Sequence, residues 1–444
     1  MHISPRYETM NNVKRVMTLF AIVLSVGMLS CEKNSDTEQD MPDMPRPSLP
    51  SIPEANSKTI NVEIPGTLDE LLLGVDKSQI IKLTITGNLD PEDLHVSADL
   101  CRKFSSISIL DMHDAEITRD TGSGPTPTFS VSFRGCSNLA FVLLPKGIPY
   151  IDDNFFSSNN LIMFTIPNSV TGMGRHILSS ECVNFQEYIV GENNKAFSSF
   201  NGVLFNKKKT ILRSCPMGKK GDLKIPSSVV TIDEHAFTQC KKLTSIIIPE
   251  NVTNIGEYAF SGCEKLASII IPKNISVIKK GTFSGCTNLI SIPLSNNITK
   301  IEPSAFWMCV NFKEYVVEED NRVYSSLDGL LFNKKRTALI ACPEGKEGTL
   351  KIPNNVIDVA ERAFSSCQKL QSIIIPNSVT SIGSSAFSYC NNLKDIICYA
   401  EEPPIFNKTG RFSLTTKLYV PKNSIEKYIN SNWGEIFKDS IYEL

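Results

Sequence analysis

The chain has 444 residues, 41% hydrophobic and 21% charged, which is an ordinary globular composition with enough apolar material for a core. The formal net charge of −2 excludes a global basic field, so we expect no nucleic-acid partner. The 13 cysteines are too sparse for a small disulfide scaffold.

Residues 1–30 have the pattern of a secretory signal. Lys14 and Arg15 precede a short apolar run from Leu19 to Leu29, which is too short for an ordinary membrane span. The run ends in Met28-Leu29-Ser30-Cys31, which resembles the lipobox of bacterial lipoproteins. The resemblance implies a lipid anchor on Cys31 and attachment to a membrane. The alternative is a plain signal peptide that happens to be followed by a cysteine.

Residues 31–58 are rich in Pro, Ser, Asp and Glu and carry little apolar surface. Such a segment does not fold, and it serves as an extended tether of about 3.1 Å per residue. Its acidic start resembles the surface-export signal of Bacteroidota lipoproteins. This implies an outer-membrane or cell-surface location in a Gram-negative bacterium.

A repeat of 23 residues is the strongest signal in the sequence. Cys240, Cys263, Cys286 and Cys309 follow one another at this spacing. The repeat reads C-x-x-L-x-x-I-x-I-P-x-x-V-x-x-I-x-x-x-A-F. The L-x-x-I-x-I part predicts a strand with one buried face, and the proline ends it. One such coil cannot bury its own apolar face, so the pattern predicts a mainly β solenoid of stacked coils.

This repeat resembles the BspA-like, or treponemal-type, leucine-rich repeat of bacterial surface proteins. The resemblance implies a right-handed coil stack with a parallel β-sheet on one face, spanning residues 101–398. Residues 59–100 and 399–444 resemble the N- and C-terminal caps of that family. Ser158 replaces the cysteine of one coil, and Pro293 lies two places early in another. Both are expected to be local irregularities.

The cysteine column is predicted to be structural. Equivalent positions on adjacent coils lie about 4.8 Å apart, whereas a disulfide requires about 3.8 Å between Cβ atoms. We therefore expect a row of buried, reduced thiols. The line of thiols lacks the converging ligands of a metal site, so no metal or cofactor is expected.

Two similar inserts, near residues 191–222 and 318–349, are predicted to form β-hairpins about 20 Å apart, since Asn-Gly or Asp-Gly opens each one. Their tips carry the basic residues Lys207, Lys208, Lys209, Lys334, Lys335 and Arg336. These residues form either solvated turns or a pair of basic prongs that meet an acidic glycan or protein.

The outward-facing strand positions are a second candidate binding site. One outward column is Ser245, Ser268, Ser291 and Ser372, and the next is Leu143, Ile247, Ile270 and Ile374. An apolar column beside a hydroxyl column is typical of a protein-binding face. The alternative is that isoleucine simply suits a pleated surface.

The sequence contains no recognisable catalytic constellation. None of the five histidines stands in a metal-binding spacing, and no nucleophile elbow or phosphate loop is present. We therefore expect a binding protein rather than an enzyme. Adhesion to a host or neighbour-cell protein is the first hypothesis, as the family resemblance implies. Glycan capture for nutrient uptake and a structural surface coat are the alternatives. No aromatic column is expected on the strand face, which favours a protein ligand over a glycan.

Overall fold

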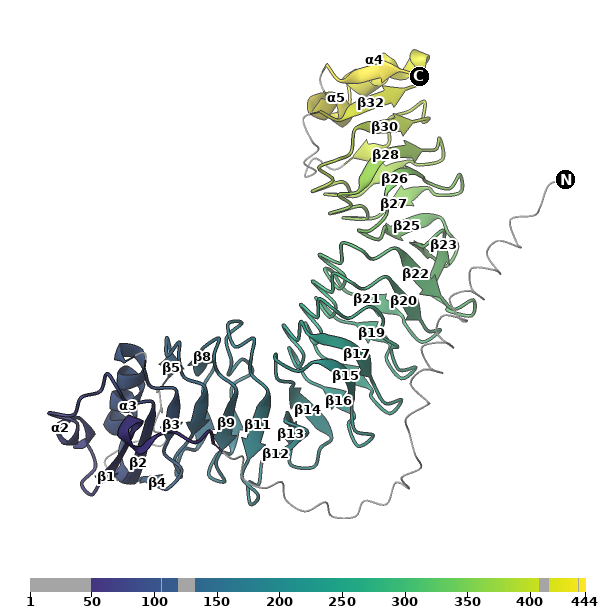
Figure 1. Ribbon diagram of the computed structural model, residues 1–444. Helices are drawn as coiled ribbons and strands as arrows, with labels where there is room; N and C mark the ends of the chain where they lie inside the picture. Colours follow the sequence, from purple (N-terminus) through teal and green to yellow (C-terminus); the bar gives the residue numbers. More distant parts are fainter. Residues whose placement is uncertain (1–48, 105, 119–131, 407–414, 438) are drawn as a thin grey trace, which may run out of the picture. The chain divides into compact units, whose positions relative to one another are not determined.

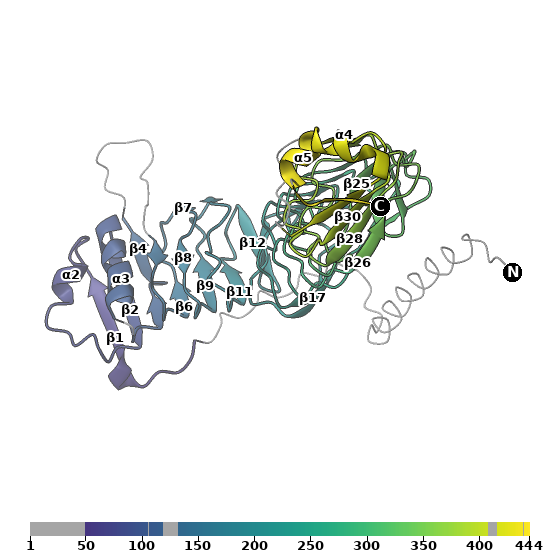
Figure 2. The same cartoon turned by 90° about the horizontal axis from the view of Figure 1, so that it is seen from above.

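A computed structural model of the protein describes residues 49–104, 106–118, 132–406, 415–437 and 439–444. The predicted signal, Cys31 and most of the predicted tether lie outside these residues. Residues 49–444 form one compact unit. In it, successive coils of the chain each lay a strand beside that of the previous coil (Figures 1 and 2). This arrangement confirms the predicted β solenoid.

The N-terminal part combines a short parallel sheet with helices. Its elements are η1 (Glu54–Asn56), β1 (Ser57–Val62), α2 (Leu68–Leu71), β2 (Lys82–Leu89), α3 (Pro91–Lys103) and β4 (Ala115–Ile117). Asp90 and Asp93 form a capping box at the start of α3, and Pro91 takes the first helical position. Because η1 and the start of β1 lie within residues 31–58, the predicted tether ends earlier than expected.

The front face of the solenoid is built from one strand per coil. These strands are β3 (Ile109–Asp111), β6 (Phe141–Leu143), β9 (Met163–Ile166), β11 (Glu187–Val190), β15 (Gly221–Lys224), β17 (Leu243–Ile247), β20 (Ser291–Leu294), β22 (Glu314–Val317), β26 (Gly348–Lys351), β28 (Leu370–Ile375), β30 (Asp395–Cys398) and β32 (Lys417–Val420). All pairs within this face are parallel, in the groups β1-β2-β3-β6-β9-β11, β15-β17, β20-β22 and β26-β28-β30-β32-β33.

Shorter strands run along the other sides of the coils. They are β5 (Phe133–Arg134), β7 (Tyr150–Ile151), β8 (Phe156–Ser157), β10 (Gly172–Met173), β16 (Thr231–Ile232), β18 (Asn254–Ile255), β19 (Val277–Ile278), β21 (Lys300–Ile301), β27 (Asp358–Val359), β29 (Ser381–Ile382) and β31 (Ile405–Phe406). Each pairs in parallel with a neighbouring coil, for example β16 with β18 and β27 with β29.

Aromatic rings stack along the core from coil to coil. Phe237 and Phe260 have ring centroids 5.1 Å apart, and Phe260 and Phe283 lie 5.6 Å apart, both nearly parallel. All three side chains are fully buried. A phenylalanine buried in this way contributes about 1.5–3 kcal/mol. The alanine-phenylalanine pair of the repeat therefore links each coil to the next.

The buried cysteines also connect the coils, through hydrogen bonds. The Cys263 thiol donates to the Phe237 carbonyl at 3.3 Å, and the Cys286 thiol donates to the Phe260 carbonyl at 3.2 Å. Ser158, in the coil that lacks the cysteine, is buried and donates to the previous coil instead, including to the Leu139 carbonyl at 3.0 Å. The column therefore requires a small side chain that can donate a hydrogen bond.

Pro293 lies next to an interruption of the front sheet. It lies within β20, paired with Val316, at the position that Ile270 holds one coil earlier. A proline has no N–H to donate to the neighbouring strand. Residues 266–271 of the preceding coil form no strand, and the front sheet is interrupted between β17 and β20.

Each insert is a three-stranded antiparallel meander. The strands are β12 (Phe197–Phe200), β13 (Val203–Asn206) and β14 (Ile211–Ser214) in the first insert, and β23 (Tyr324–Leu327), β24 (Leu330–Asn333) and β25 (Ala338–Ala341) in the second. Asn201 and Gly202 have φ values of 49° and 75°, as do Asp328 and Gly329 at 51° and 76°, which suits a tight hairpin turn. A side chain at Gly202 would also lie 2.7 Å from the Glu187 Cβ atom.

A buried asparagine joins each insert to the coil before it. The Asn194 amide donates to the carbonyls of Pro167 and Val170, at 2.8 and 2.9 Å. Its carbonyl oxygen accepts from the backbone N–H groups of Ala196 and Phe197. Asn321 makes the same four kinds of contact in the second insert. The polar side chain is thus fully satisfied at the point where the chain leaves the regular coil.

The C-terminal end is closed by η2 (Lys422–Ser424), α4 (Ile425–Ile429), α5 (Asn432–Phe437) and β33 (Ile441–Glu443). Trp433 is fully buried and its indole donates to the Pro404 carbonyl at 2.9 Å. Tyr428 is also fully buried and donates to the Ala400 carbonyl at 2.9 Å. These side chains cover the last coil, whose core would otherwise meet water.

Two buried serines test whether a buried hydroxyl stabilises the fold only when it is hydrogen-bonded. Among the described residues, the Ser295 hydroxyl has no hydrogen-bond partner, whereas the Ser158 hydroxyl is hydrogen-bonded. Removing an unsatisfied buried hydroxyl relieves its desolvation cost, so Ser295→Ala should raise the free energy of unfolding by about 1 kcal/mol. Ser158→Ala should lower it by about 1–3 kcal/mol. Denaturant unfolding monitored by circular dichroism measures both free energies of unfolding, and equal effects of the two substitutions would contradict this role of the hydrogen bonds.

Candidate binding face

The predicted apolar column lies on the outer side of the front strands. Ile247 and Ile270 leave 54% and 50% of their surface exposed, and Ile374 is partly buried. Strand pairing puts Lys224 beside Ile247, at the start of this column. Because Ile246 and Ile248, on either side of Ile247, are buried, the exposed isoleucine does not belong to the core.

The column continues in the C-terminal coils further than the sequence indicated. The strand register runs Ile374 to Ile397, then to Tyr419, then to Tyr442. Ile397 was available from the sequence, because it lies one repeat after Ile374. The 23-residue repeat does not place Tyr419 in the column, since the last coil is one residue shorter than the repeat. Tyr442 belongs to a strand of the cap, which no repeat predicts.

Tyr419 and Tyr442 form an aromatic pair at this end of the face. Their ring centroids lie 5.6 Å apart, and Tyr442 is 41% exposed. The Lys417 ammonium lies 5.5 Å from the centre of the Tyr442 ring. The sequence predicts no aromatic column on the strand face, and the cap strand β33 adds one tyrosine in register with Tyr419, so that two aromatic rings lie at this end of the face.

The predicted hydroxyl column is only partly exposed. Its members Ser245, Ser268, Ser291 and Ser372 are all partly buried. Strand pairing places carboxylates beside three of these serines, namely Asp222, Glu314 and Asp395. The hydroxyl column is thus bordered by acidic groups, and the face combines an apolar line with a polar, mildly acidic one.

Leu143 does not belong to the exposed column. It is 3% exposed, and Ile109 and Met163 on neighbouring strands are each 1% exposed. All three stand outside the continuous core of the N-terminal coils, so they are covered on the outer side of the sheet. This part of the front face is therefore closed, and the open part begins after the first insert.

The basic residues of the insert tips are largely held by their own inserts. Lys207 donates to the Glu192 carbonyl at 3.1 Å, and Lys334 donates to the Glu319 carbonyl at 2.7 Å. The Lys209 ammonium lies over the Phe200 ring, 5.5 Å from its centre. Arg336 donates to the Ser326 carbonyl at 3.3 Å. Lys208 and Lys335 are exposed and make no such contact with the described part of the chain, so one cation at each tip is exposed to solvent.

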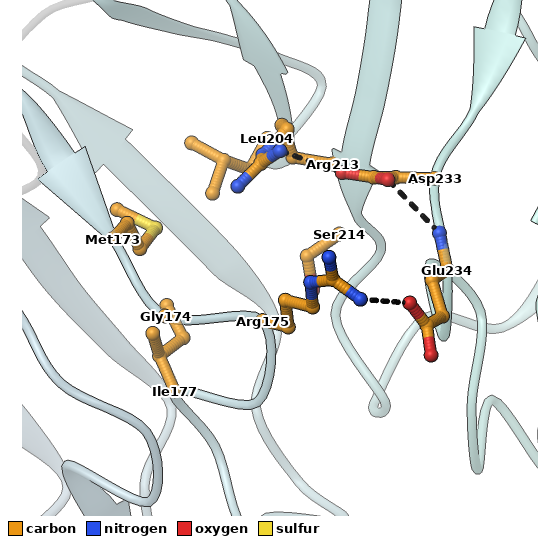
Figure 3. Close-up of a pocket in the computed structure, with 9 residues that line it drawn as sticks. All are labelled: Met173, Gly174, Arg175, Ile177, Leu204, Arg213, Ser214, Asp233 and Glu234. Carbon is orange, nitrogen blue, oxygen red and sulfur yellow. Dashed lines mark hydrogen bonds and ion pairs between the residues drawn. The ribbon is translucent and has the colours of Figure 1, made fainter.

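A polar hollow lies where the first insert meets the earlier coils (Figure 3). Arg175 pairs with Glu234, and Arg213 pairs with Asp233 at 2.7 Å. Both arginines that line it are thus already neutralised by a carboxylate. The two ion pairs connect the segment after β10, and β14, to the turn after β16. Among the described strands, β10 and β16 do not pair with each other, so the ion pairs link coils that no strand pairing joins at this place. We interpret the hollow as a place where two ion pairs hold neighbouring coils together, here called the electrostatic seam.

His235 lies beside this seam. Its ring lies 4.1 Å from the ring of His176 and stacks on Tyr258 at 5.1 Å. Burial, followed by the nearby His176, lowers the pKa of His235 below the ordinary value. The described residues contain no group of three or more His, Cys, Asp or Glu side chains that converge as metal ligands. Within the same part of the chain, no helix has the length and apolarity to cross a bilayer.

The sequence matches the model of the BspA type leucine-rich repeat region in 6 copies, over residues 128–214, 214–327 and 346–432. These residues amount to well over half of the chain. The chain belongs to the BspA-type leucine-rich-repeat family. The matches include the front strands from β15 to β32. They omit residues 328–345, which form most of the second insert, and the residues after 432, among them Tyr442.

Solved structures of similar proteins are bacterial. A leucine-rich repeat protein from Eubacterium ventriosum is 22% identical with a TM-score of 0.39, over 75% of this chain and 90% of its own. A leucine-rich cell surface protein from Faecalibacterium prausnitzii is 22% identical with a TM-score of 0.40, over 70% and 89%. The pneumococcal vaccine antigen PcpA is 18% identical with a TM-score of 0.34, over 88% and 78%. A comparison with curated proteins found no match.

This leucine-rich-repeat protein contains one buried carboxyl that its internal repeat does not require. Glu344 follows the Cys-Pro of the second insert, where the first insert has Met217. Its carboxylate accepts a hydrogen bond from the Met308 backbone N–H at 3.0 Å. Burial raises the pKa of Glu344 from 4.5 to about 7, and that hydrogen bond offsets the effect only in part. The adjacent Trp307 and Met308 are about half exposed.

Glu344→Gln should alter the pH dependence of stability. The folded protein holds the Glu344 proton more tightly than the unfolded chain, so wild-type stability should fall as pH rises from about 4.5 to about 7. Glutamine keeps an acceptor for Met308 and does not titrate. Its stability advantage should therefore grow across this window, by up to about 3 kcal/mol. Thermal unfolding at several pH values measures it, and a constant difference from pH 4.5 to 7.5 would contradict the assignment.

Proposed function

We propose that this BspA-type protein is exported, held at a membrane by a lipid on Cys31, and binds an extracellular protein through the open front face. In this proposal residues 1–30 are the signal, the tether runs from Cys31 to about Pro53, and the coils act as a rigid platform. The platform faces outward from an outer membrane or cell surface. Catalysis has no part in the proposal.

The exposed isoleucines of consecutive coils are the observation that supports binding. Ile247 and Ile270 each leave about half of their surface in contact with water. Exposed apolar side chains on two consecutive coils, bordered by hydroxyl and carboxylate groups, suit a protein interface with an apolar centre and a polar rim. Repeat proteins bind along such extended faces, because neighbouring coils present the same position at a fixed spacing.

Substitution in the column should abolish the binding. The full mature chain is tested against an array of extracellular matrix proteins and polysaccharides, and Ile247→Asp with Ile270→Asp is then compared with it. The pair should weaken binding of a protein ligand at least about 10-fold, since the centre of an interface dominates its affinity. Ile357→Asp is the matched control, because Ile357 is 43% exposed and lies outside the front strands. Equal binding by both variants would contradict the proposed face.

Glycan capture is a second candidate, favoured by the tyrosine pair at the end of the column. Tyr419 and Tyr442 present adjacent rings, and sugar rings pack on aromatic faces. On the same array, Tyr419→Ala with Tyr442→Ala should then remove polysaccharide binding. Tyr389→Ala, at a tyrosine that is 67% exposed elsewhere, should not. Protein binding without any polysaccharide signal would exclude this candidate, and self-association alone would indicate the surface-coat role.

The insert tips remain a predicted secondary contact. Lys208→Ala with Lys335→Ala removes the two cations that have no contact within their own insert. If the tips meet an acidic ligand, this pair should weaken binding more at low ionic strength than at high, because salt screens exposed charges. An unchanged affinity at both salt concentrations would leave the tips as solvated turns.

The lipid anchor is tested separately in cells. Wild-type protein grown with radiolabelled palmitate should carry label, and Cys31→Ser should carry none because the acylated thiol is missing. Immunoblotting of both proteins controls for expression. Label on the Cys31→Ser protein, or none on wild type, would contradict the proposed anchor.

A further inference from the structure

Two pairs of cysteines differ from the other thiols of the column. In the first insert, Cys215 and Cys240 both direct their sulfur atoms at the Pro216 carbonyl oxygen, at 3.8 and 3.7 Å. In the second, Cys342 and Cys367 share the Pro343 carbonyl in the same way, at 3.6 and 3.7 Å.

The thiols of each pair also meet at a second carbonyl group. The Cys240 thiol donates to the carbonyl of Cys215 itself at 3.6 Å, and the Cys367 thiol donates to the carbonyl of Cys342 at 3.8 Å. In a regular coil, Cys263 donates instead to the Phe237 carbonyl, three residues before the preceding cysteine. The insert cysteine therefore brings both its backbone carbonyl and its thiol to the thiol of the next coil, and this geometry occurs in two copies.

The pairs lie where the solenoid is least continuous. The front sheet is interrupted after β11 and again after β22, at the two inserts. Cys215 and Cys342 follow β14 and β25, and their partners begin the next coil. The Cys215 N–H also donates to the Ala236 carbonyl at 2.7 Å, and the Cys342 N–H donates to the Ala363 carbonyl at 2.6 Å. A covalent bond at either place would tie an insert to the coil that follows it.

We propose that Cys215–Cys240 and Cys342–Cys367 are oxidised to disulfide bonds when the chain folds in an oxidising compartment, with a thiol–disulfide exchange protein or small disulfide as the oxidant. In each pair two S–H bonds break and one S–S bond forms. Two electrons and two protons pass to the disulfide of the oxidant, which leaves as two thiols.

The timing follows from burial. All four cysteines are buried in the folded chain, and burial raises the pKa of Cys240 well above the ordinary value. Neutral, buried thiols react slowly, so the bonds form as the coils assemble and are afterwards shielded from reductants. Oxidation in the cell rests on the export proposed above, whereas the chemistry itself can be tested on the purified chain.

Peptide mapping tests the proposal directly. The full mature chain is unfolded with reductant, refolded in an oxidised/reduced glutathione buffer, alkylated and digested with trypsin without reduction. We expect peptide 214–219 linked to peptide 225–241, and peptide 337–346 linked to peptide 363–369. Folding is verified by circular dichroism. Natively folded protein in which these peptides are found only alkylated would overturn the proposal.

A thermal comparison distinguishes these pairs from the rest of the column. Refolding under oxidising rather than reducing conditions should raise Tm by several degrees, because a cross-link restricts the unfolded chain. Cys215→Ser with Cys342→Ser should lose this shift. Cys263→Ser with Cys286→Ser, at unpaired members of the column, should keep it even if its absolute Tm falls. A shift that persists in the first variant would overturn the proposal, and neither readout depends on the ligand.

Discussion

The stacking of each coil on its neighbours is the constraint on which the rest of the structure depends. A single 23-residue coil has no interior of its own, so its Phe260 ring, its thiol and its strand backbone all find their partners one coil away. Each residue type of the repeat therefore recurs because it contacts the equivalent position of the neighbouring coil. The same constraint explains the caps, where Trp433 and Tyr428 supply the partner that a further coil would have provided.

The open front face is a by-product of this stacking. Once each strand buries every second side chain, the remaining positions of successive coils form straight columns that the core does not specify. The interruptions limit these columns: the N-terminal end is covered, the sheet is interrupted between β17 and β20, and each insert begins a new block. Residues along the open blocks are free to vary, which suits a scaffold whose specificity lies in its surface.

The sequence predicts the fold because the residues that form the fold recur in every coil. It predicts the binding face only in part, because some residues of that face are set by features outside the repeat. Ile247 and Ile270 could be placed from the period alone, since the position of a residue in the repeat decides which side of the strand it occupies. Leu143 has the same position, but it is only 3% exposed, which the repeat alone does not predict. Tyr442 lies one period after Tyr419, but it joins the column through a strand of the cap, which the repeat does not predict. The approach of the Cys240 thiol to the Cys215 carbonyl depends on how the insert returns to the coil.

The most direct test of coil stacking is the thermal unfolding of a chain that lacks one coil. Deleting residues 263–285 removes one 23-residue period and joins Gly262 to Cys286, so every remaining side chain keeps an equivalent neighbour. Far-UV circular dichroism should show native β structure and a cooperative transition within a few degrees of wild type. A deletion of about half this length, starting at the same residue, should abolish the transition because it puts core positions opposite surface positions. Equal tolerance of both deletions, or loss of folding in the one-period deletion, would contradict the account.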